Sequence, residues 1–193
     1  MSACKNHLSK KQLLAQTYYA FFGLIAVTGM RTGEALALRR DSVDFEHGII
    51  TIFESKFRKT RKIPIHPSTV GVLKEYSRFR DRYFEKKSSE YFFVNQCGGQ
   101  LKSQMVVFKK ICTLIGVNKQ GKFPIRLTDL RHTFAVKALV NCYKSGGDVD
   151  SIIPILAMYL GHENPQHTYW YLTATPELMS LIVARLETHL GDK

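Results

Sequence analysis

The stretch LTDLRHTFAV, residues 127–136, places a guanidinium inside an apolar helix. Apolar residues at helical spacing predict a strong helix over 129–144, ended by a glycine pair. An arginine near the start of such a helix needs a partner, because burying an unpaired charge is costly. Glu34 and Asp129 are the candidate partners of Arg131, and an ordinary buried ion pair is the alternative to a functional role.

A second arginine, Arg31, occurs in TGMRTGE, residues 28–34. The pattern over 13–27 predicts a buried helix that ends near Gly29, and a short helix over 32–38 follows it. A helix junction flanked by glycines exposes backbone N–H groups, which suits an anion. Here too, an ion pair is the simpler interpretation for the arginine taken alone.

The segment YLGHENPQHTYWYL, residues 159–172, separates His162 from Tyr171 by nine residues. Nine residues are about 2.5 helical turns, so one regular helix would put the two on opposite faces. Pro165 interrupts the helix, and the break lets the two side chains converge. Taken alone, the tyrosines of this segment are typical of core or interface positions.

A small antiparallel sheet is predicted by the β-branched run over 49–53 and by Ile63 and Ile65 around Pro64. The connection between these strands contains KFRKTRK, residues 56–62. It is either a solvated turn or a hairpin laid against phosphates. Its five cations are Lys56, Arg58, Lys59, Arg61 and Lys62.

Composition narrows the possible partners. The 193 residues include 28 Lys plus Arg against 16 Asp plus Glu, a net charge of +12, and 45% are hydrophobic. The chain can therefore bury a core, and its charge favours a polyanion such as nucleic acid. The longest apolar stretch, 18–27, is too short to span a membrane. The four cysteines form no CxxC pair, and no phosphate-binding loop, dinucleotide fingerprint or HExxH motif occurs.

Further helices are expected after the sheet, with one more short strand over 91–94. Ser9 with Gln12 forms a capping box for the first helix. The predicted fold class is mainly α with a small antiparallel β-sheet (α+β), in a single domain. The later helices are expected over 67–84, 102–115, 150–160, 165–172 and 176–190.

The order of these motifs resembles the catalytic domain of the tyrosine recombinases, which are site-specific recombinases of the phage-integrase type. TGMRTGE, a lysine-bearing hairpin, LTDLRHTFA, LGH and a tyrosine nine residues beyond that histidine follow one another over about residues 9–190. Each motif is weak alone, and their order makes the resemblance specific. It implies a helical catalytic domain with a three-stranded sheet.

The resemblance assigns roles by position. Arg31 and Arg131 correspond to the arginines that hold the scissile phosphate, and Lys56 to the lysine that protonates the leaving 5′-oxygen. His162 corresponds to the family's second histidine, and Tyr171 is the nucleophile in preference to Tyr169 or Tyr159. Glu34 matches a structural acidic position. The remaining hairpin cations Arg58, Lys59, Arg61 and Lys62 are expected to bind DNA.

One position departs from the family pattern. Thr128 stands where a histidine is usual, three residues before Arg131. A hydroxyl can donate a hydrogen bond to a phosphate oxygen, but it cannot accept the tyrosine proton near neutral pH. His132 is the nearest substitute, and the adjacent helical position points about 100° away. The departure indicates a slow enzyme, a different base, or a degenerate copy.

The function implied is cleavage and rejoining of DNA through a 3′-phosphotyrosyl intermediate, on a mobile element or phage, with no metal and no cofactor. The alternatives are a type IB topoisomerase-like relaxing enzyme and a non-catalytic DNA-binding module. The expected partner is double-stranded DNA, with a homo-tetramer on DNA, a monomer without it, and no membrane. The target sequence and the direction of recombination cannot be read from the chain.

The resemblance also bears on domains and assembly. Family members usually carry an N-terminal DNA-binding domain, so residues 1–193 are expected to be a catalytic domain without it. The terminal helix over 176–190 has an apolar stripe that either packs internally or docks onto a neighbouring protomer. A prokaryotic, cytoplasmic and nucleoid-associated location is expected.

Overall fold

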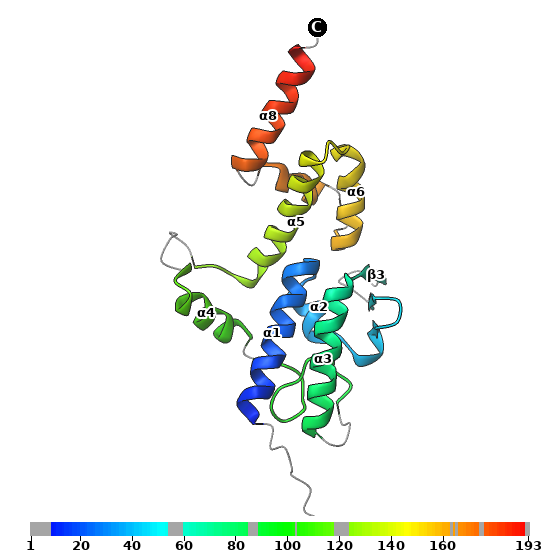
Figure 1. Ribbon diagram of the computed structural model, residues 1–193, viewed down its shortest axis with the longest axis vertical. Helices are drawn as coiled ribbons and strands as arrows, with labels where there is room; N and C mark the ends of the chain where they lie inside the picture. Colours follow the sequence, from blue (N-terminus) through cyan, green and yellow to red (C-terminus); the bar gives the residue numbers. More distant parts are fainter. Residues whose placement is uncertain are drawn as a thin grey trace, which may run out of the picture.

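The computed structural model describes residues 9–53, 60–84, 89–102, 104–117, 124–162, 164, 166–173 and 176–191. The helices among them lie as Figure 1 shows. Their bounds are α1 (Lys10–Thr28), α2 (Thr32–Ala37), α3 (Pro67–Phe84), α4 (Gln104–Leu114), α5 (Leu127–Lys144), α6 (Val149–Leu160), α7 (Gln166–Tyr169) and α8 (Pro176–Gly191), with 3-10 turns η1 (Arg40–Ser42) and η3 (Trp170–Thr173).

Helix α1 begins and ends where its sequence predicts. The Ser9 hydroxyl accepts the Gln12 N–H, and the Gln12 side chain accepts the Ser9 N–H, so the capping box is confirmed. Gly29 ends the helix in the left-handed conformation at φ +62°. A Cβ there would lie 2.5 Å from Phe134, so this turn also needs glycine for its close approach to α5.

The predicted antiparallel sheet is confirmed, and it has the three strands that the family resemblance implies. Strand β2 (Ile49–Ile52) pairs with β3 (Arg61–Pro64), with Ile50 opposite Ile63, and with β1 (Val43–Asp44) on its other edge. The alternation that buries Ile50 and Ile63 follows the period of two in a strand. Strand β1 is only two residues long, so it leaves no periodic signal in the sequence.

The core has two main parts. One lies among α1, α2, α3 and the sheet, and α1 and α3 run side by side there (Figure 1). The other lies among α5, α6, η3 and the start of α8. Helix α4 packs through Phe108 and Cys112 in a smaller cluster with Leu127. Helix α8 then projects away from the rest of the molecule (Figure 1).

Two predicted elements were wrong in detail. Residues 91–94 make only isolated bridges, Arg39 with Tyr91 and Val94 with Gln100, because no second strand runs alongside them. The helix expected over 165–172 is a single turn, α7, that tightens into η3. The other helices lie within a few residues of their predicted bounds.

Candidate active site

Arg31 lies at the junction of α1 and α2, as predicted, and its contacts reach two parts of the fold. Its backbone N–H and its Nη1 donate to the Glu34 carboxylate at 2.9 and 3.0 Å. Its Nη2 donates to the Gly161 carbonyl at 2.5 Å, 130 residues further along the chain. The side chain remains 35% exposed, so part of the guanidinium faces solvent.

Arg131 is buried on α5, and neither predicted carboxylate is its hydrogen-bond partner. Its Nη1 donates to the Gly29 carbonyl at 2.8 Å and its Nη2 to the Leu160 carbonyl at 2.9 Å. Asp129 instead accepts the N–H of Arg126 at 2.7 Å, because it occupies the capping position of its own helix. The carbonyls at the ends of α1 and α6 therefore accept the hydrogen bonds of this guanidinium. The prediction that Arg131 forms an ion pair with Glu34 or Asp129 was wrong.

The charges around Arg131 affect its proton affinity. Burial and the neighbouring Arg31 guanidinium lower the pKa of Arg131, while Tyr171 and Glu34 oppose them. The influence of Tyr171 on the pKa of Arg131 shows that the two side chains lie close together. The guanidinium thus lies near Tyr171, the residue that the family resemblance assigns as the nucleophile.

Glu34 lies between two arginines. Its carboxylate accepts Arg61 Nη1 and Nη2 at 2.9 and 2.7 Å in addition to the bonds from Arg31. Burial alone would raise the pKa of this carboxyl, but the hydrogen bonds from Arg61 and Arg31 hold it below its usual range. Such a doubly paired carboxylate fits the structural role predicted for Glu34.

Arg61 does not lie where its place in a basic hairpin suggests. Its side chain is only 11% exposed, and its Nε donates to the Tyr159 carbonyl at 3.0 Å. Its neighbour Lys62 is exposed, because the two residues alternate across strand β3. The other predicted cations, Lys56, Arg58 and Lys59, lie outside the described residues.

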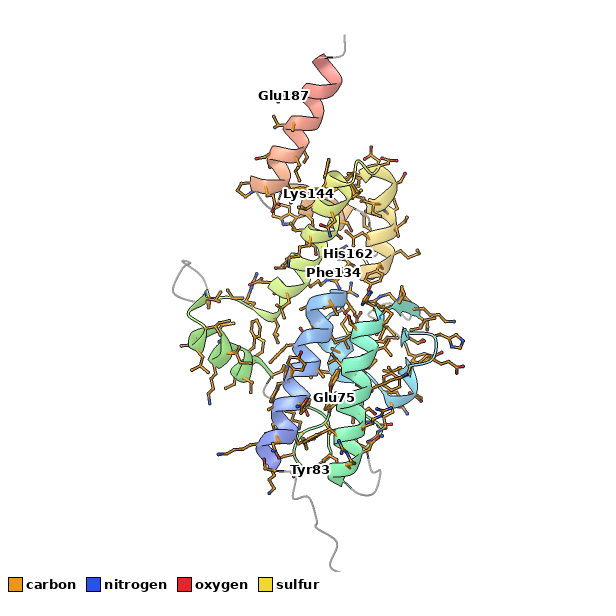
Figure 2. All side chains as sticks on the ribbon, in the orientation of Figure 1. Glu75, Tyr83, Phe134, Lys144, His162 and Glu187 are labelled. Carbon is orange, nitrogen blue, oxygen red and sulfur yellow. The ribbon has the colours of Figure 1, made fainter. Side chains whose placement is uncertain are left out.

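His162 and Tyr171 converge as predicted; the break that the structure shows is at Gly161, and Pro165 lies outside the described residues. Gly161 ends α6 at φ +71°, and the chain then returns through α7 and η3. The two rings stack with centroids 6.1 Å apart, and His162 Nδ1 lies 2.8 Å from the hydroxyl of buried Thr168. Figure 2 shows His162 close to Phe134, where the lower end of α6 meets the upper end of α1.

The three candidate tyrosines have different environments. Tyr171 is 4% exposed and faces the two histidine rings and Arg131. Tyr159 stacks on Phe134, and burial raises its pKa to about 12. Tyr169 is 44% exposed. Tyr171 is the most buried of these three, and its ring is the one that lies beside both histidine rings.

His132 is the residue that sequence reasoning placed wrongly. A rotation of about 100° from Arg131 suggested that it faces elsewhere. Its ring instead lies 5.5 Å from that of Tyr171, tilted by 57°, because η3 packs alongside α5. Thr128 is exposed in the first turn of α5. The pairing of His132 with Tyr171 depends on the path of the chain after α6, which the spacing of residues does not record.

The described part of the chain holds no group of three or more His, Cys, Asp or Glu side chains placed to share a metal ion. Cys97, Cys112 and Cys142 are free thiols. No helix among the described residues has the length and apolar character needed to cross a membrane.

The chain resembles known proteins both in sequence and in fold. Residues 1–177 match the sequence profile of the phage integrase family. The chain is 39% identical over 181 residues to a protein of Sinorhizobium fredii named "Putative integrase/recombinase y4rB", covering 92% of this chain and 58% of that one. It is 29% identical over 167 residues to the tyrosine recombinase XerC of Oceanobacillus iheyensis, covering 85% and 51%.

Solved structures share the fold. The XerA recombinase superimposes with a TM-score of 0.68 at 23% identity, covering 96% of this chain and 64% of that one. The catalytic domain of bacteriophage HP1 integrase gives a TM-score of 0.53 at 21% identity, covering 95% and 92%. The predicted fold class is therefore confirmed. The chain spans somewhat more than half the length of the two curated relatives above.

Proposed function

The chain belongs to the phage integrase family, and on this premise we propose that residues 1–193 are a catalytic domain that cuts and rejoins DNA at specific sites. The proposal assigns it to a site-specific recombinase or integrase of a mobile element or phage. One observation carries it: Arg31, Arg131, His162 and Tyr171 converge at the end of α6 from three separate segments.

The proposed reaction is a transfer of one phosphodiester bond. The Tyr171 oxygen attacks the scissile phosphorus, and the bond from phosphorus to the 5′-oxygen breaks. His162 assists removal of the tyrosine proton, and Lys56 gives a proton to the leaving oxygen. The product is a 3′-phosphotyrosyl link and a free 5′-hydroxyl. Rejoining reverses these steps and needs no nucleotide cofactor, because the covalent link retains a phosphodiester.

Arg31 and Arg131 suit the charge that develops in this reaction. Two planar guanidiniums can each donate paired hydrogen bonds to the non-bridging oxygens, which lysines cannot match. Donors held in place before the reaction are worth most, because they need no rearrangement in the transition state. The bonds to Gly29, Leu160 and Gly161 supply that rigidity. Protein cations thereby take the part that a metal plays elsewhere.

Double-stranded DNA is the proposed partner, with Lys62 and the hairpin cations Lys56, Arg58 and Lys59 on its phosphates. A DNA substrate also places the protein with the nucleoid. We extend the proposal to a homo-tetramer on DNA, with a monomer in its absence. In α8, Leu178 packs into the protein's own core, while Met179 and Val183 remain exposed and available to a neighbouring protomer.

The test uses a pool of nicked duplexes whose bases on both sides of the nick are randomised. Cleavage near the nick releases a short fragment, so the protein stays covalently attached to the DNA. Wild type and Tyr169→Phe are expected to give an adduct that survives boiling in detergent, and Tyr171→Phe none. Equal adduct from Tyr171→Phe and wild type would show that another residue is the nucleophile.

The same proteins distinguish the neighbouring functions. A site-specific recombinase captures a restricted set of sequences from the pool, which sequencing of the adducts reveals. A type IB topoisomerase-like enzyme would instead relax supercoiled plasmid and capture sequences without preference. A non-catalytic binding module would retain DNA in a filter assay and form no adduct.

A further inference from the structure

The last turn of α6 is held by three guanidiniums at once. Its final carbonyls, those of Tyr159, Leu160 and Gly161, accept hydrogen bonds from Arg61, Arg131 and Arg31 at 3.0, 2.9 and 2.5 Å. The C-terminal carbonyls of a helix lack partners within the helix and carry partial negative charge. Each arginine comes from a different element, so this helix end is fixed from three directions immediately before His162.

Arg61 differs from the other two in bonding through all three of its guanidinium nitrogens, whereas the side-chain bonds of Arg31 and Arg131 described above use Nη1 and Nη2. Its Nη1 and Nη2 bind the two Glu34 oxygens, while its Nε binds Tyr159. Arg31 is three times as exposed as Arg61 and can turn part of its guanidinium to a phosphate. A lysine could not make the same three contacts, because it lacks the planar fork.

Glu34 couples Arg61 to Arg31, because its carboxylate accepts hydrogen bonds from both guanidiniums. With Arg61 in place, one carboxylate is shared between two guanidiniums. Without it, the carboxylate would have only Arg31 as a close partner and would draw that guanidinium into a full ion pair. Arg31 would then be partly neutralised and turned away from the DNA.

From these contacts we propose that Arg61 is a positioning residue for cleavage and not a DNA contact. It keeps Glu34 from capturing Arg31, and it fixes the end of α6 that carries His162. The inference rests on the proposed function, because its main readout is DNA cleavage.

The chain offers a matched control for its removal. Asp81 is shared by Arg40 and Arg80 in the way that Glu34 is shared by Arg61 and Arg31. Arg40 binds Asp81 through two bonds of 3.1 and 2.6 Å, and its side chain is 16% exposed. It joins η1 to α3. Arg40→Met therefore removes a comparable ion pair and leaves the candidate site intact.

The experiment measures single-turnover adduct formation against DNA concentration, using a nicked duplex selected from the randomised pool. Arg61→Met is expected to lower the rate at saturating DNA by about 10²-fold, since displacement of catalytic groups by about 1 Å has that effect. The half-saturating DNA concentration should change by less than about threefold, because no phosphate contact is lost. Arg40→Met should match wild type in both, and Arg61→Lys should lie between.

The double variant Arg61→Met with Glu34→Gln separates positioning from a structural role. Removing the carboxylate's charge frees Arg31, so the double variant should regain about tenfold over Arg61→Met, a coupling typical of residues in one network. No recovery, or a loss confined to DNA affinity, would overturn the proposal. If Arg61→Met does not fold, Arg61→Lys with and without Glu34→Gln provides the same comparison.

A second readout does not depend on cleavage. The His162 N–H donates to the Ala157 carbonyl at 2.9 Å, and its hydrogen exchange reports how firmly the end of α6 is held. Exchange should be at least about tenfold faster in Arg61→Met and unchanged in Arg40→Met. Unchanged exchange in both would overturn the proposal. Absence of adduct from wild type itself would reject the proposed function, and exchange would then decide the role of Arg61 alone.

Discussion

Replacing Gly161 by alanine tests how closely the arginines approach the end of α6. Gly161 has φ +71°, and a Cβ there would lie 2.7 Å from Arg61 Nη1 and 3.2 Å from Arg31 Nη1. Gly146, at the end of α5, has φ +70°, and its Cβ would meet nothing within 4 Å. Gly161→Ala and Gly146→Ala therefore share the same backbone strain, and only the first displaces guanidiniums.

The expected magnitudes follow from this difference. Left-handed alanine costs roughly 1–2 kcal/mol in either variant. That lowers the melting temperature by about 2–4 °C per kcal/mol in a domain of this size. In Gly161→Ala, Arg61 must also retreat by about 0.7 Å to restore an ordinary contact of 3.4 Å. A shift of this order in a catalytic group costs roughly 10- to 100-fold in rate.

Thermal melts followed by circular dichroism give the stability, and single-turnover adduct formation on the selected nicked duplex gives the rate. Gly146→Ala should melt lower than wild type and cleave at the wild-type rate. The unfolding free energy of Gly161→Ala should lie within about 1 kcal/mol of that of Gly146→Ala, because the far end of the Arg61 side chain can move aside. Its cleavage rate should be at least about tenfold lower than that of Gly146→Ala. Equal cleavage rates in the two alanine variants would refute the reasoning, because the arginine contacts would then be irrelevant to the chemistry.

Three further predictions concern protons. Thr128→His should raise the single-turnover rate by up to about 10²-fold if the usual base is missing, and an unchanged rate would mean that another group such as His132 already takes the tyrosine proton. Glu34→Gln should lower the unfolding free energy by about 2 kcal/mol near pH 7, because Arg31 and Arg61 lose their hydrogen bonds to a charged carboxylate. Because the folded pKa of Glu34 is lowered, that contribution is complete above the unfolded value near 4.3 and disappears as the pH falls through the folded pKa, so melts from pH 7 to pH 2 should converge with wild type. Lys56→Ala should slow cleavage by about 10²–10⁴-fold on ordinary DNA and far less on DNA with sulfur in place of the leaving 5′-oxygen, since a thiolate leaves without a proton; an equal loss on both would remove Lys56 from the acid role.

Local features of the fold were predictable because their causes are local. The Ser9 and Gln12 capping box, the left-handed Gly29 and the break after α6 each act within a few residues, and each has a sequence signature. The convergence of His162 with Tyr171 follows from that break. The sequence thus predicted these local elements from short-range signals, and it predicted the candidate site residues from the family resemblance that the order of the motifs carries.

Partnerships across the chain were not predictable in the same way. Arg131 donates to two backbone carbonyls. Because residues of every type have a backbone carbonyl, the sequence gives no sign of which ones an arginine will bind. In the sequence, Arg61 cannot be distinguished from the other cations of its basic run. Its side chain points inward because side chains alternate along β3 and because α6 packs against the inner face of that strand. His132 on α5 meets Tyr171 because the chain turns back after α6, so that η3 packs beside α5. Each outcome depends on how distant segments pack.

The bonds that hold the arginines also join the first and last parts of the chain. Arg31 and Arg61 reach forward 130 and 98 residues, and Arg131 reaches back 102. Contacts this distant in sequence form late in folding, because the intervening chain must first be ordered. During synthesis, the first arginine has no α6 to bind until residue 161 has emerged from the ribosome. A partly made chain therefore lacks both Tyr171 and the contacts that hold the arginines, so the proposed site forms only once the segment after α6 is in place.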